Sequence, residues 1–163
     1  MRNIQKKPQI KYNEESDTHE LERLLLFKVE RFLSEMGGMF AFVGSQFQTA
    51  SNGIRNFIDL LFYHRILQCL IVIELKNGGH LLKHMENIKL CLAVLDKSVR
   101  APHENYSIGI ILSKINNRTT IEYALRESDE PVGSEYRLFR TLPDEMKSVL
   151  PSPEQIEDLL DGI

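Results

Sequence analysis

The most apolar segment of this chain, FIDLLFYHRILQCLIVIELKNG at residues 57–78, places the strongest constraint on its fold. It divides into two strand-like runs, 57–64 and 67–76, joined by a very short link. Such a link makes the two runs antiparallel, and with the preceding run at 39–48 they predict a three-stranded meander. The segment nevertheless carries Asp59, Glu74 and Lys76. Charged side chains are rarely buried without partners, so these three call for an explanation.

The register of the two runs brings these charges together. Side chains alternate across a strand. If the link folds around residues 66 and 67, positions whose numbers sum to 133 face each other, which pairs Asp59 with Glu74. Directly opposed residues have Cβ atoms ~5 Å apart. We therefore expect both carboxylates and Lys76 on one face, and the following apolar residues on the other: Ile58, Leu60, Ile71 and Ile73.

The remaining patterns predict one mixed α/β domain with the element order αβββαβββα. A helix begins near Asp17, whose spacing to Glu20 resembles a capping box, and ends at Gly37. A second helix connects the third strand to a parallel fourth strand by a right-handed crossover. The expected ranges after the meander are 81–99 for this helix, 107–114, 119–127 and 135–142 for strands, and a short helix from Pro153.

Composition narrows the class of protein. The 163 residues suffice for one domain, which we divide into a flexible arm at 1–16 and a folded domain at 17–163. No apolar run approaches the ~20 residues of a membrane span, and the polar N-terminus has no secretory pattern. Cys69 and Cys91 show no ligand spacing, so we expect reduced thiols in a cytoplasmic protein. The net charge of −3 argues against non-specific coating of polyanions but allows a small basic groove.

Two interpretations of the three charges stay open on residue types alone. Asp59, Glu74 and Lys76 could form an ion triad at a frayed strand end. Alternatively, the two carboxylates could hold Mg²⁺ or Mn²⁺, which prefer such oxygen ligands. Buried ion triads are weak evidence for stability, which favours the metal interpretation slightly.

Longer stretches of the chain point to a family. Residues 59, 74 and 76 form D-x14-E-x-K across a hairpin, and around them stand FAFVGSQF, FIDLLFYHRILQCLIVIELK, PHENYSIGIILSK and EYALRESDEPVGSEYRL. Over residues 19–160 these resemble the C-terminal nuclease domain of the YhcG-like family, in the PD-(D/E)XK nuclease superfamily. The resemblance implies a restriction-endonuclease-like αβββαβ core with extra C-terminal strands, and a metal-dependent endonuclease with DNA as the expected substrate, in restriction, repair or a resolvase-like role.

The resemblance also implies roles for single residues. Asp59, Glu74 and Lys76 match the catalytic triplet, and Asp59 and Glu74 match the metal ligands for Mg²⁺ or Mn²⁺. Further metal candidates are the main-chain carbonyl of Leu75 and, on the first helix, Glu22, which could equally be a solvated acid. Gln46 matches a polar position in the family's VGRQ-like segment. The candidates for contacts with nucleic acid are Gln46, Arg55, His64, Arg65, Lys83, Asn87 and Lys89.

Several departures from the family pattern keep a second function open. Ser45 and Asn87 stand where Arg and Gln are expected, and the loop at 77–80 is less basic. The family's usual N-terminal helical domain is missing from this sequence. The alternative is therefore a catalytically weak or inactive module that binds nucleic acid or a partner protein. The late strands could also support a homodimer, and His80 and His84 have an i, i+4 metal-binding spacing that we regard as secondary.

Overall fold

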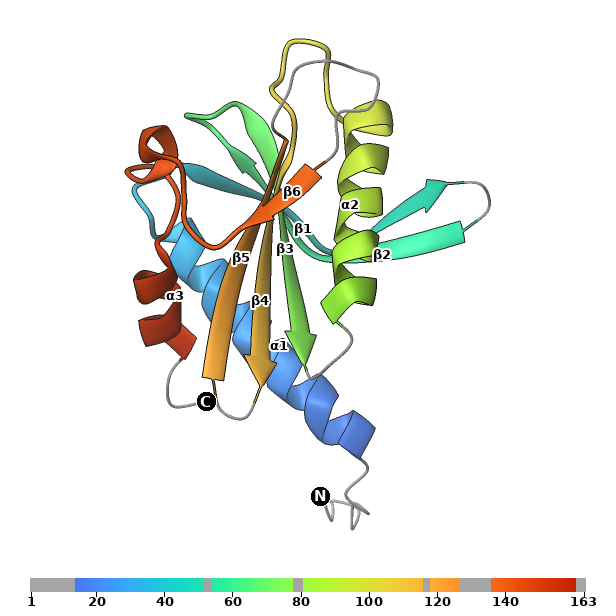
Figure 1. Ribbon diagram of the computed structural model, residues 1–163, viewed down its shortest axis with the longest axis vertical. Coiled ribbons are helices and arrows are strands. Elements are labelled where there is room, and N and C mark those ends of the chain that lie inside the picture. The colour runs from blue at the N-terminus through green and yellow to red at the C-terminus, as the bar shows by residue number, and fades with distance from the viewer. Residues whose placement is uncertain (1–13, 52–53, 78–80, 116–117, 127–135, 161–163) are drawn as a thin grey trace, which may run out of the picture.

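The computed structural model describes residues 14–51, 54–77, 81–115, 118–126 and 136–160 (Figure 1). Its elements follow the predicted order. They are α1 (Glu14–Ser34), β1 (Phe40–Ser51), β2 (Ile54–His64), β3 (Cys69–Asn77), α2 (Leu81–Ser98), β4 (Ile108–Ile115), β5 (Arg118–Arg126), β6 (Tyr136–Phe139), a 3-10 turn (Asp144–Met146) and α3 (Pro153–Leu160).

The strands form one mixed six-stranded sheet in the order β1-β2-β3-β4-β5-β6. β3 and β4 are parallel and are linked through α2, whereas every other neighbouring pair is antiparallel. In Figure 1, α2 covers one face of the sheet while α1 and α3 lie against the other. The predicted fold class, a mixed sheet flanked by helices with extra C-terminal strands, is confirmed.

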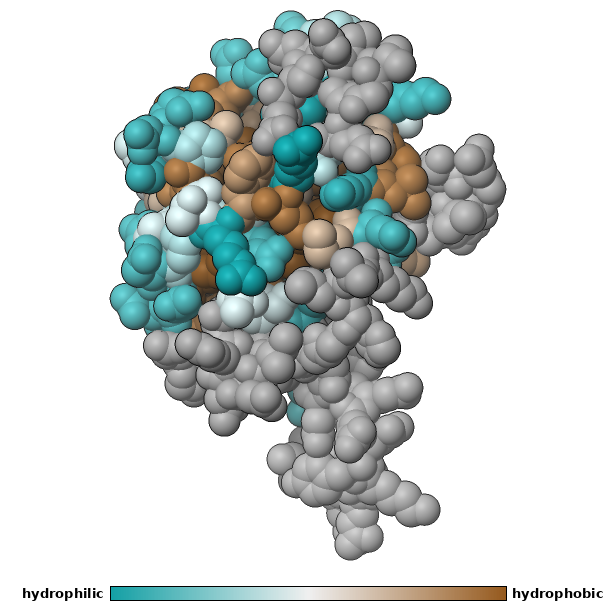
Figure 2. All heavy atoms as spheres, viewed as in Figure 1, coloured by the Kyte–Doolittle hydropathy of each residue, from teal (hydrophilic) through white to brown (hydrophobic). Residues whose placement is uncertain are grey.

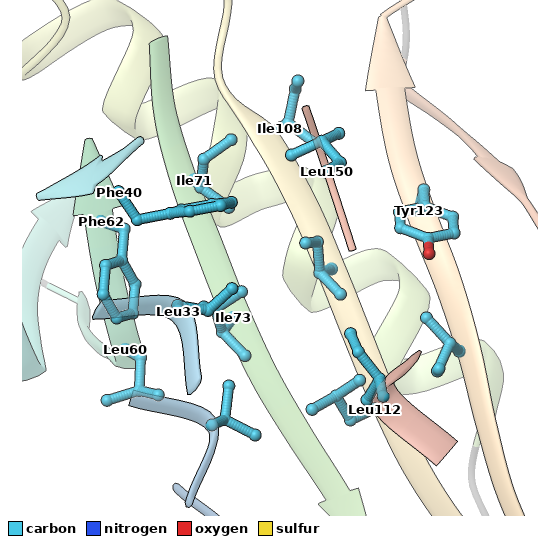
Figure 3. Close-up of a cluster of buried hydrophobic side chains, with 14 of the residues drawn as sticks. Leu33, Phe40, Leu60, Phe62, Ile71, Ile73, Ile108, Leu112, Tyr123 and Leu150 are labelled. Atoms are coloured by element: carbon cyan, nitrogen blue, oxygen red, sulfur yellow. The ribbon is translucent and has the colours of Figure 1, made fainter. Parts of the chain in front are cut away.

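Two apolar layers hold the helices onto the sheet. The layer under α1 and α3 includes Leu33, Phe40, Phe62, Ile73 and Tyr123, which point into one cluster in Figure 3. The layer under α2 includes Leu61, Val72, Leu92 and Leu95. α2 approaches β4 closely at Gly109, where a Cβ would lie 3.1 Å from atoms of both Ala124 and Leu92. A glycine there lets the helix sit low on the sheet.

The register predicted for β2 and β3 is confirmed. Leu60 pairs with Ile73, and the pairing continues without a shift to His64 and Cys69. The ladder stops one pair before Asp59 and Glu74. The β1–β2 ladder is also interrupted here: it passes from Ser45–Leu60 to Phe47–Ile58 without a pair at Gln46 and Asp59. Gln46 has a left-handed backbone with φ of 49°.

This interruption makes one packing prediction wrong. Ile58 was expected on the face of Leu60 and Ile73, but it packs in the α2 layer with Leu61. Strict alternation would place residues 58 and 61 on opposite faces. The irregular backbone opposite Asp59 breaks the alternation, as expected where a ladder is disrupted.

Other boundaries differ from expectation at the ends of elements. α1 begins at Glu14, so Asp17 lies inside the helix and the predicted arm at 1–16 overlaps its first turn. β6 spans only Tyr136–Phe139. Cys69 and Cys91 are both free and buried. Among the described residues, no helix combines the length and apolar character that crossing a membrane requires.

Candidate active site

Asp59 is fixed at the point where β2 separates from its neighbours. Its Oδ2 accepts a hydrogen bond from the backbone N–H of Leu75 at 2.9 Å, and its Oδ1 accepts one from Nε2 of Gln46 at 3.3 Å. The carboxylate thus replaces the strand carbonyl that would otherwise receive the N–H of Leu75. Because both bonds use oxygen lone pairs, each oxygen keeps capacity for a further partner.

Glu74 lies on the α2 side of β3, and only 4% of its surface is exposed. Its Oε2 is 3.4 Å from Nζ of Lys76, two residues along the strand. Burial, followed by the negative charge and hydrogen bonding of Asp59, raises the pKa of Glu74 to about 8, and the opposing effect of Lys76 offsets this only partly. One ammonium therefore does not compensate two adjacent carboxylates. The predicted convergence of all three charges is present.

A small pocket of about 80 Å³ opens beside these charges. Its described lining residues are Phe57, Glu74, Lys76, Asn87, Ile88 and Cys91. Asn87 was predicted here, whereas Phe57, Ile88 and Cys91 were not. Ile88 and Cys91 belong to the apolar stripe of α2, which gives no chemical signal in sequence. Burial, then the charge of Glu74, raises the pKa of Cys91 to about 11, so its thiol stays protonated at neutral pH.

The predicted contacts with nucleic acid do not all reach this pocket. Gln46 does not line the pocket but donates a hydrogen bond to Asp59. Arg65 is exposed but lies in the β2–β3 turn, at the far end of the hairpin, where its Nη1 donates to the carbonyl of Gly38 at 3.1 Å. Lys89 lines a different cavity, on the other flank of α2. The side chains of Glu22, Arg55, Lys83 and His84, and all of His80, lie outside the described residues.

The prediction that His64 contacts nucleic acid is wrong. It is completely buried, so it has no surface to offer a phosphate. Its Nε2 lies 2.7 Å from the carbonyl of Val149, while its Nδ1 accepts the backbone N–H groups of Ile66 and Leu67 at 3.2 and 3.0 Å. A carbonyl can only accept, so Nε2 carries the proton and the ring is neutral. His64 therefore joins the β2–β3 turn to the C-terminal segment.

This role predicts an acid-sensitive stability. Burial lowers the pKa of His64 from its usual 6.5. The unfolded chain then binds the proton more readily, so the contribution of His64 is complete above pH 6.5 and is lost as pH falls through the lower folded pKa. We expect His64→Gln to lower the melting temperature at pH 7.5 and to remove the part of the pH dependence between pH 7 and 5 that His64 causes. Thermal melts across this range measure it; a variant with the wild-type pH slope would contradict the assignment.

The donor set at Asp59 and Glu74 fits a hard divalent cation. Among the described residues, no group of three or more His, Cys, Asp or Glu side chains gathers to hold a metal. Two carboxylates nevertheless meet here, and the raised pKa of Glu74 records uncompensated negative charge. Carboxylate oxygens are the ligands that Mg²⁺ and Mn²⁺ prefer, and such ions often keep several waters. Two carboxylates with room for water are therefore a suitable set.

Comparison with known proteins identifies the family of this chain. The family model described as the YhcG PDDEXK nuclease domain matches residues 7–151. A curated relative from Escherichia coli (strain K12), named "Putative nuclease YhcG", is 31% identical over 141 residues. The match covers 85% of this chain but only 36% of the relative, so the chain spans about a third of that protein's length. No solved structure matches the chain significantly. The resemblance seen in the sequence is thus confirmed, and the chain belongs to the YhcG PDDEXK nuclease domain family.

Proposed function

We propose that this chain hydrolyses phosphodiester bonds in nucleic acid, with DNA as its main substrate and with Mg²⁺ or Mn²⁺ as its cofactor. Membership of a nuclease family supports the reaction class. One observation carries the proposal for this chain: Glu74, buried and raised in pKa, interacts with the carboxylate of Asp59 beside the ammonium of Lys76. A divalent cation held by the two carboxylates would supply a Lewis acid at the scissile phosphate.

The protein groups around the carboxylates have separate tasks in this proposal. The bonds from Leu75 N–H and Gln46 Nε2 fix the direction in which Asp59 presents its oxygens. Lys76 is half-buried and within reach of Glu74, so its ammonium can orient a water or stabilise charge that develops on a phosphate oxygen. Such stabilisation is strong because the surroundings of Glu74 exclude most water.

The carbonyl of Leu75 is a further candidate ligand. The N–H of Leu75 points towards Asp59 on β2. In a strand, the N–H and C=O of one residue face the same neighbouring strand. The carbonyl of Leu75 then also faces the side of Asp59, beyond the last β2–β3 pair, where the ladder does not use it. This supports Leu75 as a further candidate ligand of the metal.

The margin of the pocket offers groups for a nucleotide substrate. Gln46 and Asn87 are exposed amides that can donate to phosphate oxygens. Phe57 lines the same pocket with 55% of its surface exposed, which suits stacking against a base. Endonucleolytic cleavage, a homodimer and a cytoplasmic location stay predictions.

Incubation with linear duplex, branched and single-stranded DNA, and with RNA, in Mg²⁺ or Mn²⁺ tests the proposal. We expect cleavage of at least one DNA substrate, lost in EDTA, and at least ~100-fold slower cleavage by Lys76→Ala because charge stabilisation is typically worth this much. Lys147→Ala, a change of an exposed lysine just after the 3-10 turn, is the matched control. Metal-dependent binding without cleavage of any substrate would instead favour the inactive nucleic-acid-binding module.

A further inference from the structure

A second cavity lies away from Asp59 and Glu74. It has a volume of about 800 Å³ and lies between one flank of α2 and the residues that precede β4, end β5 and begin β6. Its described lining residues are Glu86, Lys89, Leu90, Ala93, Asp96, Lys97, Arg100, Tyr106, Arg126 and Tyr136. Figure 2 shows this α2 face, where hydrophilic and hydrophobic side chains lie side by side. Such a volume falls in the range of small-molecule sites, ~300–1,000 Å³.

The charge of the lining is positive. Four of its described residues are cations and two are carboxylates. One carboxylate, Asp96, already has structural partners: Oδ1 accepts from the N–H and the hydroxyl of Ser107 at 2.9 and 2.7 Å, and Oδ2 accepts from the hydroxyl of Tyr136. These bonds tie α2 to the residue before β4 and to β6. Asp96 is thus occupied in holding the walls of the cavity together.

Two arginines from different elements gather at one aromatic ring. The guanidinium carbons of Arg100 and Arg126 lie over the ring of Tyr106, 4.5 and 3.7 Å from its centre. Nη1 of Arg100 donates to the carbonyl of Glu104 at 2.8 Å, which fixes the side chain. Its buried Nε has no hydrogen-bond partner among the described residues. Buried donors are normally paired, so an ordered guanidinium with an unused donor suggests an absent acceptor.

The chemistry of the lining selects a class of ligand. Planar guanidinium groups and lysines recognise phosphate oxygens. The two guanidiniums already cover the ring of Tyr106, but guanidinium groups themselves stack on flat rings. Leu90 and Ala93 are apolar residues exposed on the same flank of α2. A ligand that uses both parts carries a phosphate and a flat ring. We propose that this cavity binds a nucleoside phosphate, either free or as one nucleotide of a strand, at a site separate from the catalytic pocket.

Calorimetry at low ionic strength tests this proposal, with EDTA present so that the catalytic pair holds no metal. The probes are a deoxynucleoside monophosphate, the nucleoside without phosphate, inorganic phosphate and a short single-stranded oligonucleotide. We expect the nucleotide or the oligonucleotide to bind more tightly than phosphate, and the nucleoside not to bind. Asp59→Asn should bind as the wild type does. Tight binding of the mononucleotide identifies a free ligand, and binding of the oligonucleotide alone identifies a strand.

Charge-reversal variants locate the site. Lys89→Glu/Lys97→Glu changes two lining residues at the helix surface and should weaken binding by tenfold or more. The control Arg23→Glu changes an exposed charge on α1, on the opposite face of the sheet, and should leave binding unchanged. Arg100→Lys keeps the charge but removes Nε and should also weaken binding. No binding by any nucleotide probe, or equal affinity in the wild type and the double lysine variant, would overturn the proposal.

Discussion

Asp59→Asn is expected to abolish cleavage while the protein stays folded. The substitution removes the charge that would help to hold a divalent cation, and it keeps an oxygen that can accept the N–H of Leu75. Loss of a metal-holding charge costs several kcal/mol of transition-state stabilisation, so we expect at least a ~10³-fold lower rate. The initial rate of cleavage of the best substrate, at saturating Mg²⁺, measures the effect.

The comparison with Asp59→Ala separates the two roles of this side chain. Alanine also removes the acceptor for Leu75, and an unsatisfied buried N–H costs ~1–3 kcal/mol. That cost opposes the relief of repulsion with Glu74. We therefore expect both variants to be inactive but the alanine variant to be the less stable in denaturant melts. Asp158→Asn, an exposed change on α3, serves as the control. Wild-type cleavage by Asp59→Asn would rule out this carboxylate as a metal ligand.

The central hairpin was predictable because local rules determine it. A short link between two apolar runs sets the register, and the register of Leu60 with Ile73 follows directly. The same rules failed at Ile58 because the backbone opposite Asp59 is irregular, and a left-handed Gln46 has no sequence signature. The irregularity is also what separates the strands and exposes the N–H of Leu75 to the carboxylate. The departure from regular pairing therefore belongs to the site itself.

Long-range contacts explain the other differences. Histidine is a residue type that can contact phosphate, which is why His64 was a candidate. Its actual partner, Val149, is 85 residues away in the chain. No residue near His64 in the sequence indicates that hydrogen bond. The cavity beside α2 was equally hidden, since Arg100, Tyr106 and Arg126 come from different parts of the chain and meet only in the folded sheet. The segments that carry the family resemblance include Tyr106 and Arg126, but the resemblance implied no role for these residues.

In the metal-free protein, the contribution of Glu74 to stability should fall as pH rises from about 5 to 9. Its pKa is about 8 in the folded chain against the usual 4.5, so the folded state holds this proton more tightly than the unfolded state. The favourable contribution is complete below pH 4.5 and is lost as pH rises through 8. A shift of this size corresponds to a few kcal/mol. Glu74→Gln should therefore melt ~5–10 °C higher than the wild type at pH 8.5 in EDTA.

A divalent cation should reverse this difference. A ligand that binds only the folded state stabilises it in proportion to the logarithm of its concentration. Mg²⁺ or Mn²⁺ should raise the melting temperature of the wild type at pH 8, and raise it much less in Glu74→Gln, which lacks the charge. Glu157→Gln, an exposed change on α3, should respond as the wild type does. Two carboxylates that merely pair with Lys76 would show the pH effect without the cation effect. The response to Mg²⁺ therefore distinguishes a metal site from an ion triad without any measurement of cleavage.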